Sequence, residues 1–306
     1  VNGLSAEAGP ILTQSPITPK RSQLLIGSQF QIEDYDQFSD EQLEDIAIAG
    51  FEEVHSTDIA YIASLAAEYG ITDNFAVSVV APFIIRNNIR EGELEDGEAE
   101  VHRLGSSKDI GDISFRFKYA FPDIDGFKIA ALAGVKVPTG RTREKEDDGS
   151  RFETEFQPGS GSWDYSLGLA ADRNWGPFTL TGSAVYTIAT EGSQDTNLGD
   201  NFAFGVAAAY RLGKGLHTHD DGLVERHDAL DLILEFVGEW QESERIGDER
   251  DIHSGSTQLF LAPGLRYSSA GGWSAFISAS LPVHENFRGI QNESDYRLNV
   301  GLGFAF

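Results

Sequence analysis

The chain lacks both sulfur-containing amino acids, and it has no apolar run long enough to form a membrane-spanning helix. None of its 306 residues is cysteine, which excludes disulfide bonds and thiolate chemistry. A transmembrane helix needs about 20 mostly apolar residues. No stretch approaches that length, so a helical membrane protein is excluded. Methionine is missing even at the first position, Val1, and we therefore expect a processed chain from which a signal peptide has been removed.

Basic residues are scarce. The chain has 23 Lys and Arg against 49 Asp and Glu, which gives a net charge of −26. Nucleic-acid binding is not expected, because its affinity comes from cationic neutralisation of phosphates. The acidic residues gather in polar segments such as 91–100 and 144–148. Solvated loops are the expected structure there, and a role in attracting cations remains open.

Apolar and polar residues alternate along most of the chain, most clearly at its end. The last eleven residues alternate without interruption and finish on an aromatic residue, Phe306. A period of two places one face of a strand against an apolar phase and the other against a polar one. A second sheet would cover the apolar face in a soluble sandwich, whereas lipid covers it in an outer-membrane barrel. The apolar set consists of Tyr296, Leu298, Val300, Leu302, Phe304 and Phe306.

The same pattern recurs in about twelve segments, and their length decides between these two folds. Strands of globular proteins usually have about five or six residues, whereas these segments have about 10 to 16, as tilted membrane-spanning strands do. Short turns rich in Gly, Asp and Asn alternate with long acidic segments, as periplasmic turns and extracellular loops do in outer-membrane barrels. The sequence therefore predicts an all-β fold, a transmembrane antiparallel β-barrel of about 12 strands with both termini on the periplasmic side. The expected strands are 24–33, 58–69, 75–83, 112–121, 127–137, 163–170, 178–188, 202–212, 230–240, 257–267, 273–284 and 296–306, and the expected long loops are 34–55, 88–108, 141–160, 189–200, 242–255 and 285–294.

Two regions differ from the barrel pattern. Residues 1–21 contain three prolines and show no period, so we expect either a flexible N-terminal lead or a plug inside the lumen, ahead of a barrel that spans 22–306. Residues 213–228 form a long connection at the end of the barrel where the other connections are short. A short helix is a further option within residues 41–50, although the apolar spacing there is weak.

Three short motifs lie close together in the sequence. They are Gly111-Asp112-Ile113, the segment from Lys136 to Gly140, and the segment from Gly159 to Asp164. Proline donates no ladder hydrogen bond and glycine permits tight bends, so their physical interpretation is structural, with ligand contact as the alternative.

Together with the barrel pattern and Phe306, these motifs resemble the outer-membrane transporter family associated with the meta pathway of phenol degradation. The resemblance is firmest over residues 108–170. It implies an outer-membrane channel for aromatic or other small organic compounds, and it brings no catalytic residues. The aromatic C-terminus also resembles the signal that the bacterial outer-membrane insertion machinery reads.

Charged residues of the alternating strands fall on the inferred lumen face and are the predicted pore-lining residues. A buried charge must be paired or hydrated, because an unpaired one costs several kcal/mol. Cross-strand ion pairs that brace the lumen are one interpretation, and a transverse field that selects solutes is the other. The cations are Arg116, Lys118, Lys128, Lys136, Arg211, Arg266 and Arg297, and the anions are Asp58, Glu68, Asp112, Asp164, Asp231, Glu235 and Glu239.

Histidines offer one weak metal candidate and no catalytic site. His217, His219 and His227 lie in the long connection with Asp220 and Asp221, and paired histidines of this spacing can bind Zn²⁺ or Cu²⁺. The other histidines are scattered and predict nothing jointly. Barrel lipases need a serine and a histidine on neighbouring lipid-facing strands, but His284 is on the lumen face and no Gly-x-Ser-x-Gly motif is present. We therefore expect no enzyme and no cofactor.

The sequence thus predicts a porin-like channel of a Gram-negative outer membrane. Small solutes would pass passively or by facilitated uptake through a charge-lined lumen. The alternative is a plugged barrel that acts as a surface binding anchor through its acidic loops. The expected partners are outer-membrane lipid and lipopolysaccharide, the insertion machinery through Phe306, and a small-molecule solute. The identity of the solute and the oligomeric state are not predicted.

Overall fold

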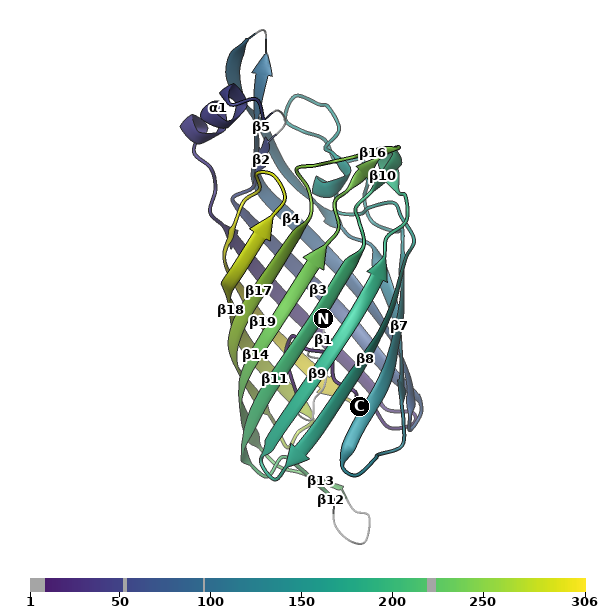
Figure 1. The fold of residues 1–306 in the computed structure, drawn as a ribbon. Coiled ribbons are helices and arrows are strands. Elements are labelled where there is room, and N and C mark those ends of the chain that lie inside the picture. The colour runs from purple at the N-terminus through teal and green to yellow at the C-terminus, as the bar shows by residue number, and fades with distance from the viewer. Residues whose placement is uncertain (1–8, 52–53, 96, 219–223) are drawn as a thin grey trace.

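The chain folds into one closed antiparallel barrel (Figure 1). The computed structural model describes residues 9–51, 54–95, 97–218 and 224–306. The main sheet has fourteen strands, and twelve of them form the wall once β2 and β5 are set aside. The ring closes where β1 pairs with β19 and where β4 pairs with β6. The wall strands are β1 (Leu24–Tyr35), β3 (Ile59–Thr72), β4 (Phe75–Glu95), β6 (Ile113–Ala120), β7 (Phe127–Val137), β8 (Asp164–Trp175), β9 (Phe178–Ile188), β11 (Asn201–Gly213), β14 (Ala229–Gln241), β17 (Ser256–Ser268), β18 (Trp273–Phe287) and β19 (Ser294–Ala305).

Short elements decorate the two ends of the wall. At the end with the long loops, which is predicted to be extracellular and is the upper end in Figure 1, the helix α1 (Asp40–Ile48) lies beside a hairpin that projects beyond the barrel. Ser39 and Gln42 form a reciprocal capping box at its first turn, which stabilises a helix despite its weak apolar spacing. No helix of the described residues is long and apolar enough to cross a membrane. The other elements are β2 (Val54–Ser56), β5 (Glu98–Ile110), β10 (Thr196–Asn197), β12 (Leu216–Thr218), β13 (Val224–Arg226), β15 (Arg245–Ile246), β16 (Glu249–Arg250) and the 3₁₀ turns η1 (Thr154–Phe156) and η2 (Ser193–Asp195).

The outward face of the wall is an apolar belt. On β6, Phe115, Phe117 and Tyr119 are exposed and alternate with Arg116 and Lys118, as the period of two predicts. Aromatic residues lie at both ends of this belt on β8, as they do in outer-membrane barrels. The predicted barrel, its strand number and its apolar outward face are therefore confirmed. Other exposed belt residues are Phe30, Leu65, Phe83, Leu167, Leu169, Leu232, Leu265 and Leu302.

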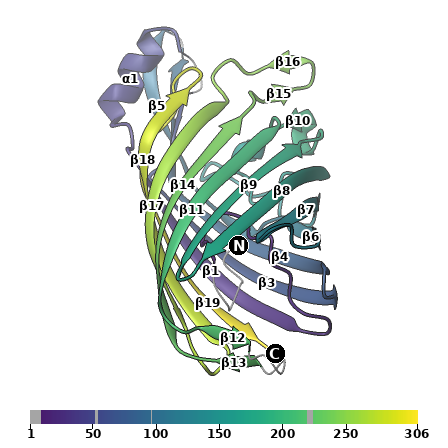
Figure 2. The ribbon, with the colours of Figure 1, turned by 60° about the horizontal axis from the view of Figure 1, so that its bottom comes forward.

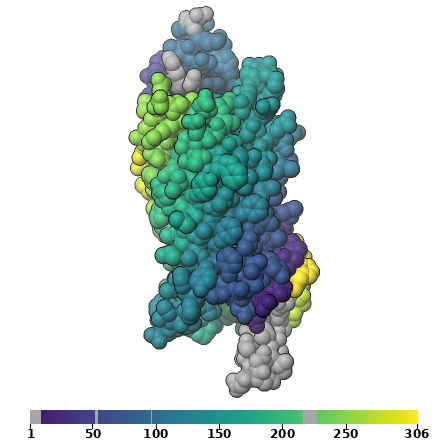
Figure 3. Space-filling view, turned by 90° about the vertical axis from the view of Figure 1, so that its right-hand side faces the viewer, coloured from purple at the N-terminus to yellow at the C-terminus, as the bar shows by residue number. Residues whose placement is uncertain are grey.

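The C-terminal strand closes the barrel beside the first strand. The Phe306 amide donates to the Leu24 carbonyl at 2.9 Å, and the Leu24 amide donates back at 3.2 Å. In the space-filling view the two ends of the barrel sequence are neighbours at the lower right (Figure 3). The Phe306 side chain is 72% exposed. The predicted pairing of the last strand with the first is therefore confirmed.

One predicted loop is instead a projecting hairpin. Residues 88–108 continue β4 and form β5, with Glu93 opposite Glu100 and Glu95 opposite Glu98. β5 and β6 both pair with β4 and are separated only at residues 111–112. Beyond the membrane neither face of a hairpin meets lipid, so both faces can be polar. Hydrophobic alternation, which marks the wall strands, therefore could not mark this extension.

Candidate functional site: the barrel lumen

An N-terminal segment, residues 10–17, lies inside the lumen (Figure 2). A carboxylate of the wall holds it there. Glu235 on β14 is completely buried. Its two carboxylate oxygens accept hydrogen bonds from three successive backbone amides, those of Ile11, Leu12 and Thr13, at 2.7 to 3.2 Å. Hydrogen bonds to a carboxylate are about twice as strong as neutral ones. Glu235 is therefore the main polar anchor of this segment.

The same part of the segment also has an apolar seat. Ile11 is fully buried and packs with Ala209, Ile233 and Phe276 of the wall. A side chain at Gly264 would put its Cβ 2.8 Å from the Ile11 side chain, so glycine is needed there for close approach. Apolar burial and charge-assisted hydrogen bonds therefore act on the same three residues.

Further contacts carry the segment across the lumen. The Gln14 amide donates to the Ser183 hydroxyl on β9 at 3.0 Å. The Lys118 ammonium on β6 donates to the Ile17 carbonyl at 2.9 Å. Because β14, β9 and β6 lie on successive parts of the wall, residues 11–17 span the interior rather than following one strand. Residues 1–8 lie outside the described part of the chain.

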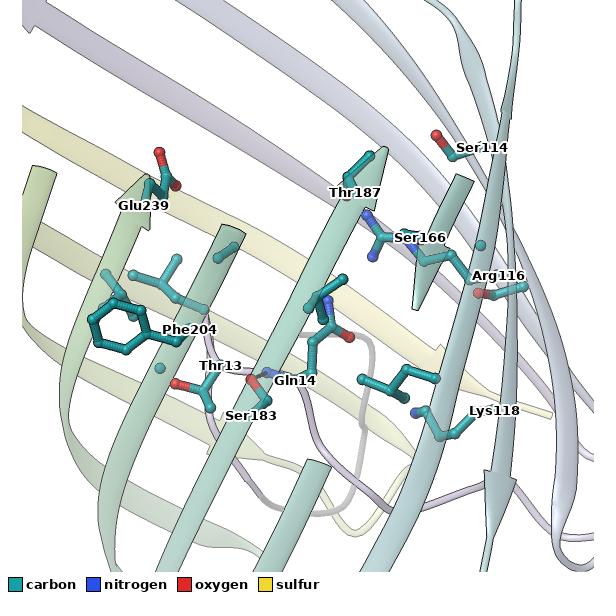
Figure 4. Close-up of a pocket in the computed structure, with 18 of the residues that line it drawn as sticks. Thr13, Gln14, Ser114, Arg116, Lys118, Ser166, Ser183, Thr187, Phe204 and Glu239 are labelled. Atoms are coloured by element: carbon teal, nitrogen blue, oxygen red, sulfur yellow. Dashed lines mark hydrogen bonds between the residues drawn. The ribbon is translucent and has the colours of Figure 1, made fainter. Parts of the chain in front are cut away.

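A cavity of about 460 Å³ remains between this segment and the wall (Figure 4). Thr13 and Gln14 face it from the segment, and Arg116 and Lys118 face it from β6. The Thr13 hydroxyl is buried and has no hydrogen-bond partner among the described residues. A space of this kind can hold water or a small polar solute. Its wall also includes the hydroxyl-bearing residues Ser114, Ser166, Ser183 and Thr187.

Several of the predicted lumen charges form ion pairs between strands of the wall, some of them across one or two intervening strands. Lys118 lies 3.1 Å from Glu68, and Arg211 binds both oxygens of Asp231 at 2.7 Å. Both Arg211 and Asp231 lie outside the lining of the cavity, whereas Lys118 belongs to it. Arg297 on β19 is 2.6 Å from Glu33 and 3.2 Å from Glu239.

Arg266 does not face the cavity. It is fully buried and donates to the Pro10 carbonyl at 2.9 Å. Together with Glu235, it therefore contacts the N-terminal segment. Arg266 and Glu235, both predicted as lumen charges, thus bind adjacent backbone groups of the N-terminal segment, the Pro10 carbonyl and the Ile11 amide.

The three short motifs converge on one carboxylate near the extracellular end of the wall. Asp112 accepts hydrogen bonds from the Gly140 amide and from the amide and hydroxyl of Ser160, each at 2.8 Å. Lys136 pairs with Asp164 and donates to the Ser160 hydroxyl at 2.7 Å. A Cβ at Gly140 would lie 2.6 Å from the Gly159 Cα, so these two glycines permit the contact. The structure thus gives all three motifs a role at one junction of β6, β7 and β8.

We expect Asp112→Ala to destabilise the barrel by about 2 to 4 kcal/mol, because three hydrogen bonds and a charge that faces Lys136 are lost together. Urea unfolding in detergent micelles measures the change. Asp109→Ala is the matched control, because its carboxylate is 38% exposed, and it should lie within about 0.5 kcal/mol of the parent. Equal stability of the two variants would contradict the structural role of the junction.

A family of known proteins includes the region that carries these motifs. A family described as "Putative MetA-pathway of phenol degradation" matches residues 45–285. The chain belongs to this family. The predicted family resemblance is thus confirmed. Among curated protein sequences, none matches the chain significantly.

Comparison with solved structures supports the fold of an outer-membrane channel. The COG4313 outer membrane channel from Pseudomonas putida F1 has a TM-score of 0.65 at 13% identity, over 98% of each chain. The NanC porin has a TM-score of 0.47 at 9% identity, over 92% of this chain and 98% of that one. The TodX deltaS2S3 mutant, a monoaromatic hydrocarbon channel, has a TM-score of 0.47 at 8% identity, over 94% of this chain and 91% of that one. With the apolar belt, the fold and the family place this chain in the bacterial outer membrane.

The sequence analysis did not predict the large apolar residues that face the lumen of this barrel. Ile233 and Phe276 are buried against the N-terminal segment. Phe260 is also buried, and the Arg297 guanidinium carbon lies 4.2 Å from its ring centre. A signal was available, because each of these residues interrupts the polar phase of its strand. Large apolar residues on a lumen face indicate that something packs inside the barrel.

The weak metal candidate lies largely outside the described structure. His219 is not among the described residues, and for His217 only the backbone, within β12, is described. The His227 amide donates to the Gly215 carbonyl at 2.9 Å. The metal-binding prediction for these three histidines therefore stays untested.

A different histidine, which the sequence did not single out, lies in an acidic setting. His55 on β2 is close to Glu91, Glu153 and Glu155 at the extracellular rim. Burial lowers the pKa of His55 to about 4, despite the opposing effect of Asp251. The imidazole is therefore neutral at physiological pH.

Proposed function

We propose that the protein is a passive channel for small organic solutes in the outer membrane. The observation that carries this proposal is the polar cavity beside the N-terminal segment, in a barrel that crosses the membrane. Solutes would be selected by the width of the remaining space and by the charges at its wall. The mechanism is diffusion, and no chemical step is involved.

The size and chemistry of the cavity favour small hydroxylated or carboxylated molecules. Ligand cavities usually measure about 300 to 1,000 Å³, so about 460 Å³ fits a single-ring compound better than an oligosaccharide. Hydroxyl groups of the wall can exchange hydrogen bonds with a phenol. The cavity lining carries Arg116, Lys118, Lys136 and Arg297 against Glu68, Asp164 and Glu239, an excess of one positive charge that favours a carboxylate. Membership of a family named for phenol degradation supports the same class. We therefore propose aromatic acids and phenols as the preferred solutes.

Arg116→Gln should lower the permeability of anions relative to cations by about twofold to fivefold, because a unit charge a few ångströms from a hydrated ion contributes up to about 1 kcal/mol. Reversal potentials across planar bilayers, in a gradient of sodium 4-hydroxybenzoate, measure this ratio. Lys145→Gln removes the same charge from the exposed loop between β7 and β8 and is the matched control. If both variants shift the ratio equally, the wall cation does not select the solute.

A plugged barrel that serves as a surface anchor is the second candidate. It is favoured by the number of contacts that hold residues 10–17 inside the lumen. The two candidates differ in one measurable property, since a plugged anchor conducts no ions while the segment is in place, whereas a channel conducts with it.

A further inference from the structure

Four ligand-bearing side chains meet at the extracellular rim, well away from the lumen cavity. His55 lies on β2, Glu91 lies on β4, and Glu153 and Glu155 flank the start of η1 in the loop between β7 and β8. His55 Nδ1 is 3.5 Å from Glu155 Oε1. On the other side of the ring, Nε2 is 3.6 Å from Glu91 Oε1 and 4.0 Å from Glu153 Oε2. Carboxylates therefore face both nitrogens of one imidazole.

The imidazole itself is the unusual member of this cluster. Its side chain is only 15% exposed, and the Phe156 ring packs edge-on against it at 4.8 Å. Its nitrogens have little access to water, whereas the Glu155 and Glu153 side chains are 34% and 49% exposed. A cation that enters from the side of Glu153 would contact a ring nitrogen and carboxylate oxygens together.

More negative charge gathers from the loop between β14 and β17. Glu244 and Asp251 of this loop repel the Glu155 carboxylate electrostatically, as Glu153 does, and the Arg86 guanidinium partly offsets them. A divalent ion would relieve the repulsion that remains among these carboxylates.

We propose that His55, Glu153 and Glu155 bind a first-row divalent transition metal ion of the Zn²⁺ type. One ligand atom from each residue lies within 4.8 Å of the others. Tetrahedral zinc with bonds of about 2.0 to 2.1 Å places its ligand atoms about 3.4 Å apart, so small side-chain rotations complete the site. An imidazole nitrogen with two carboxylates suits zinc, whereas Ca²⁺ and Mg²⁺ prefer oxygen ligands throughout. Bound metal would join β2 to the loop between β7 and β8 above the mouth of the barrel.

A second set of ligand types lies at the hairpin and serves as the internal comparison. Glu95, Glu100 and His102 also bring ligand atoms within 4.8 Å of one another. Both carboxylates there are exposed, whereas only Glu153 is exposed in the rim cluster, and the His102 side chain is 37% exposed against 15% for His55. Water can solvate the two hairpin carboxylates, so they have less need of a cation, although His102 Nε2 itself is buried without a partner among the described residues. We therefore expect the rim cluster around His55 to bind zinc more tightly than this hairpin set.

Isothermal titration calorimetry of the full-length protein in detergent, after treatment with EDTA, tests the proposal with ZnCl₂ as the titrant. We expect His55→Gln to remove one tight zinc equivalent or weaken it more than tenfold. Glu153→Gln combined with Glu155→Gln should have the same effect. His102→Gln is the matched control and should leave this equivalent in place. Heat-modifiable gel mobility of each variant verifies that the barrel has folded.

Three outcomes would overturn the proposed site. One is the absence of tight zinc binding by the folded parent protein. Another is an unchanged zinc isotherm for His55→Gln, and the third is loss of the equivalent in His102→Gln but not in His55→Gln. A parallel titration with CaCl₂ should show much weaker binding, and calcium binding as tight as that of zinc would contradict the assignment of the metal class. None of these results depends on whether the lumen conducts solutes.

Discussion

Deletion of residues 1–17 is expected to raise the single-channel conductance of the barrel severalfold. The segment 10–17 crosses the lumen from β14 to β6 and leaves a cavity of about 460 Å³ beside it. A twelve-stranded barrel without this segment has a wider interior, and ion flow increases with the cross-section of the path. Conductance in planar bilayers at fixed salt measures the change.

The shorter deletion of residues 1–8 is the control for this experiment. It leaves the contacts of Pro10, Ile11 and Thr13 with the wall in place, so it should conduct like the parent. Equal conductance of the parent and the 1–17 deletion would show that the segment does not restrict the path. If neither the parent nor the 1–17 deletion conducts, the channel proposal fails and the proposal of a surface anchor is retained.

Replacement of Glu235 by Gln is expected to loosen the same segment. The parent carboxylate accepts from three backbone amides, and a hydrogen bond to a charged group contributes about 1.5 to 3 kcal/mol. The amide group of Gln has one acceptor oxygen, and its NH₂ faces further donors. Because the chain has no cysteine, Thr13→Cys provides a single thiol at a position that is 2% exposed. We expect a hydrophilic maleimide to label this thiol about tenfold faster when Glu235 is Gln.

Glu239→Gln is the matched control for the labelling experiment. Glu239 lies on the same strand and the same lumen face, but it forms an ion pair with Arg297. Its replacement should leave the labelling rate of Thr13→Cys unchanged. If both Gln variants accelerate labelling to the same extent, loss of lumen charge explains the result and the specific anchor is contradicted.

The wall of the barrel was predictable because lipid imposes a simple rule on it. One face of each wall strand contacts the bilayer with apolar side chains, so apolar and polar residues alternate along its sequence with a period of two. This rule located the twelve strands and assigned Phe115 and Arg116 to opposite faces. It did not apply to the hairpin of β4 and β5 beyond residue 88, since that part meets no lipid and packs instead against α1 and against Phe152 and Phe156 of the loop between β7 and β8.

The interior was less predictable because its contacts join distant parts of the chain. Ile11 and Glu235 are separated by 224 positions, and nothing local distinguishes Glu235 from another lumen carboxylate such as Glu239. His55 and Glu155 are likewise brought together only by the barrel. The motifs around Asp112 could be recognised in sequence as strand ends, but their convergence on one carboxylate required the pairing of β6, β7 and β8.

The sequence by itself determined the class of fold, the face of each wall strand and the membrane in which the barrel belongs. All three follow from the local alternation that a lipid boundary enforces, strand by strand, down to the closing residues before Phe306. Only the tertiary structure decided which charges meet, where residues 10–17 lie and which carboxylates surround His55. Those outcomes depend on the register and closure of the ring, which align residues hundreds of positions apart.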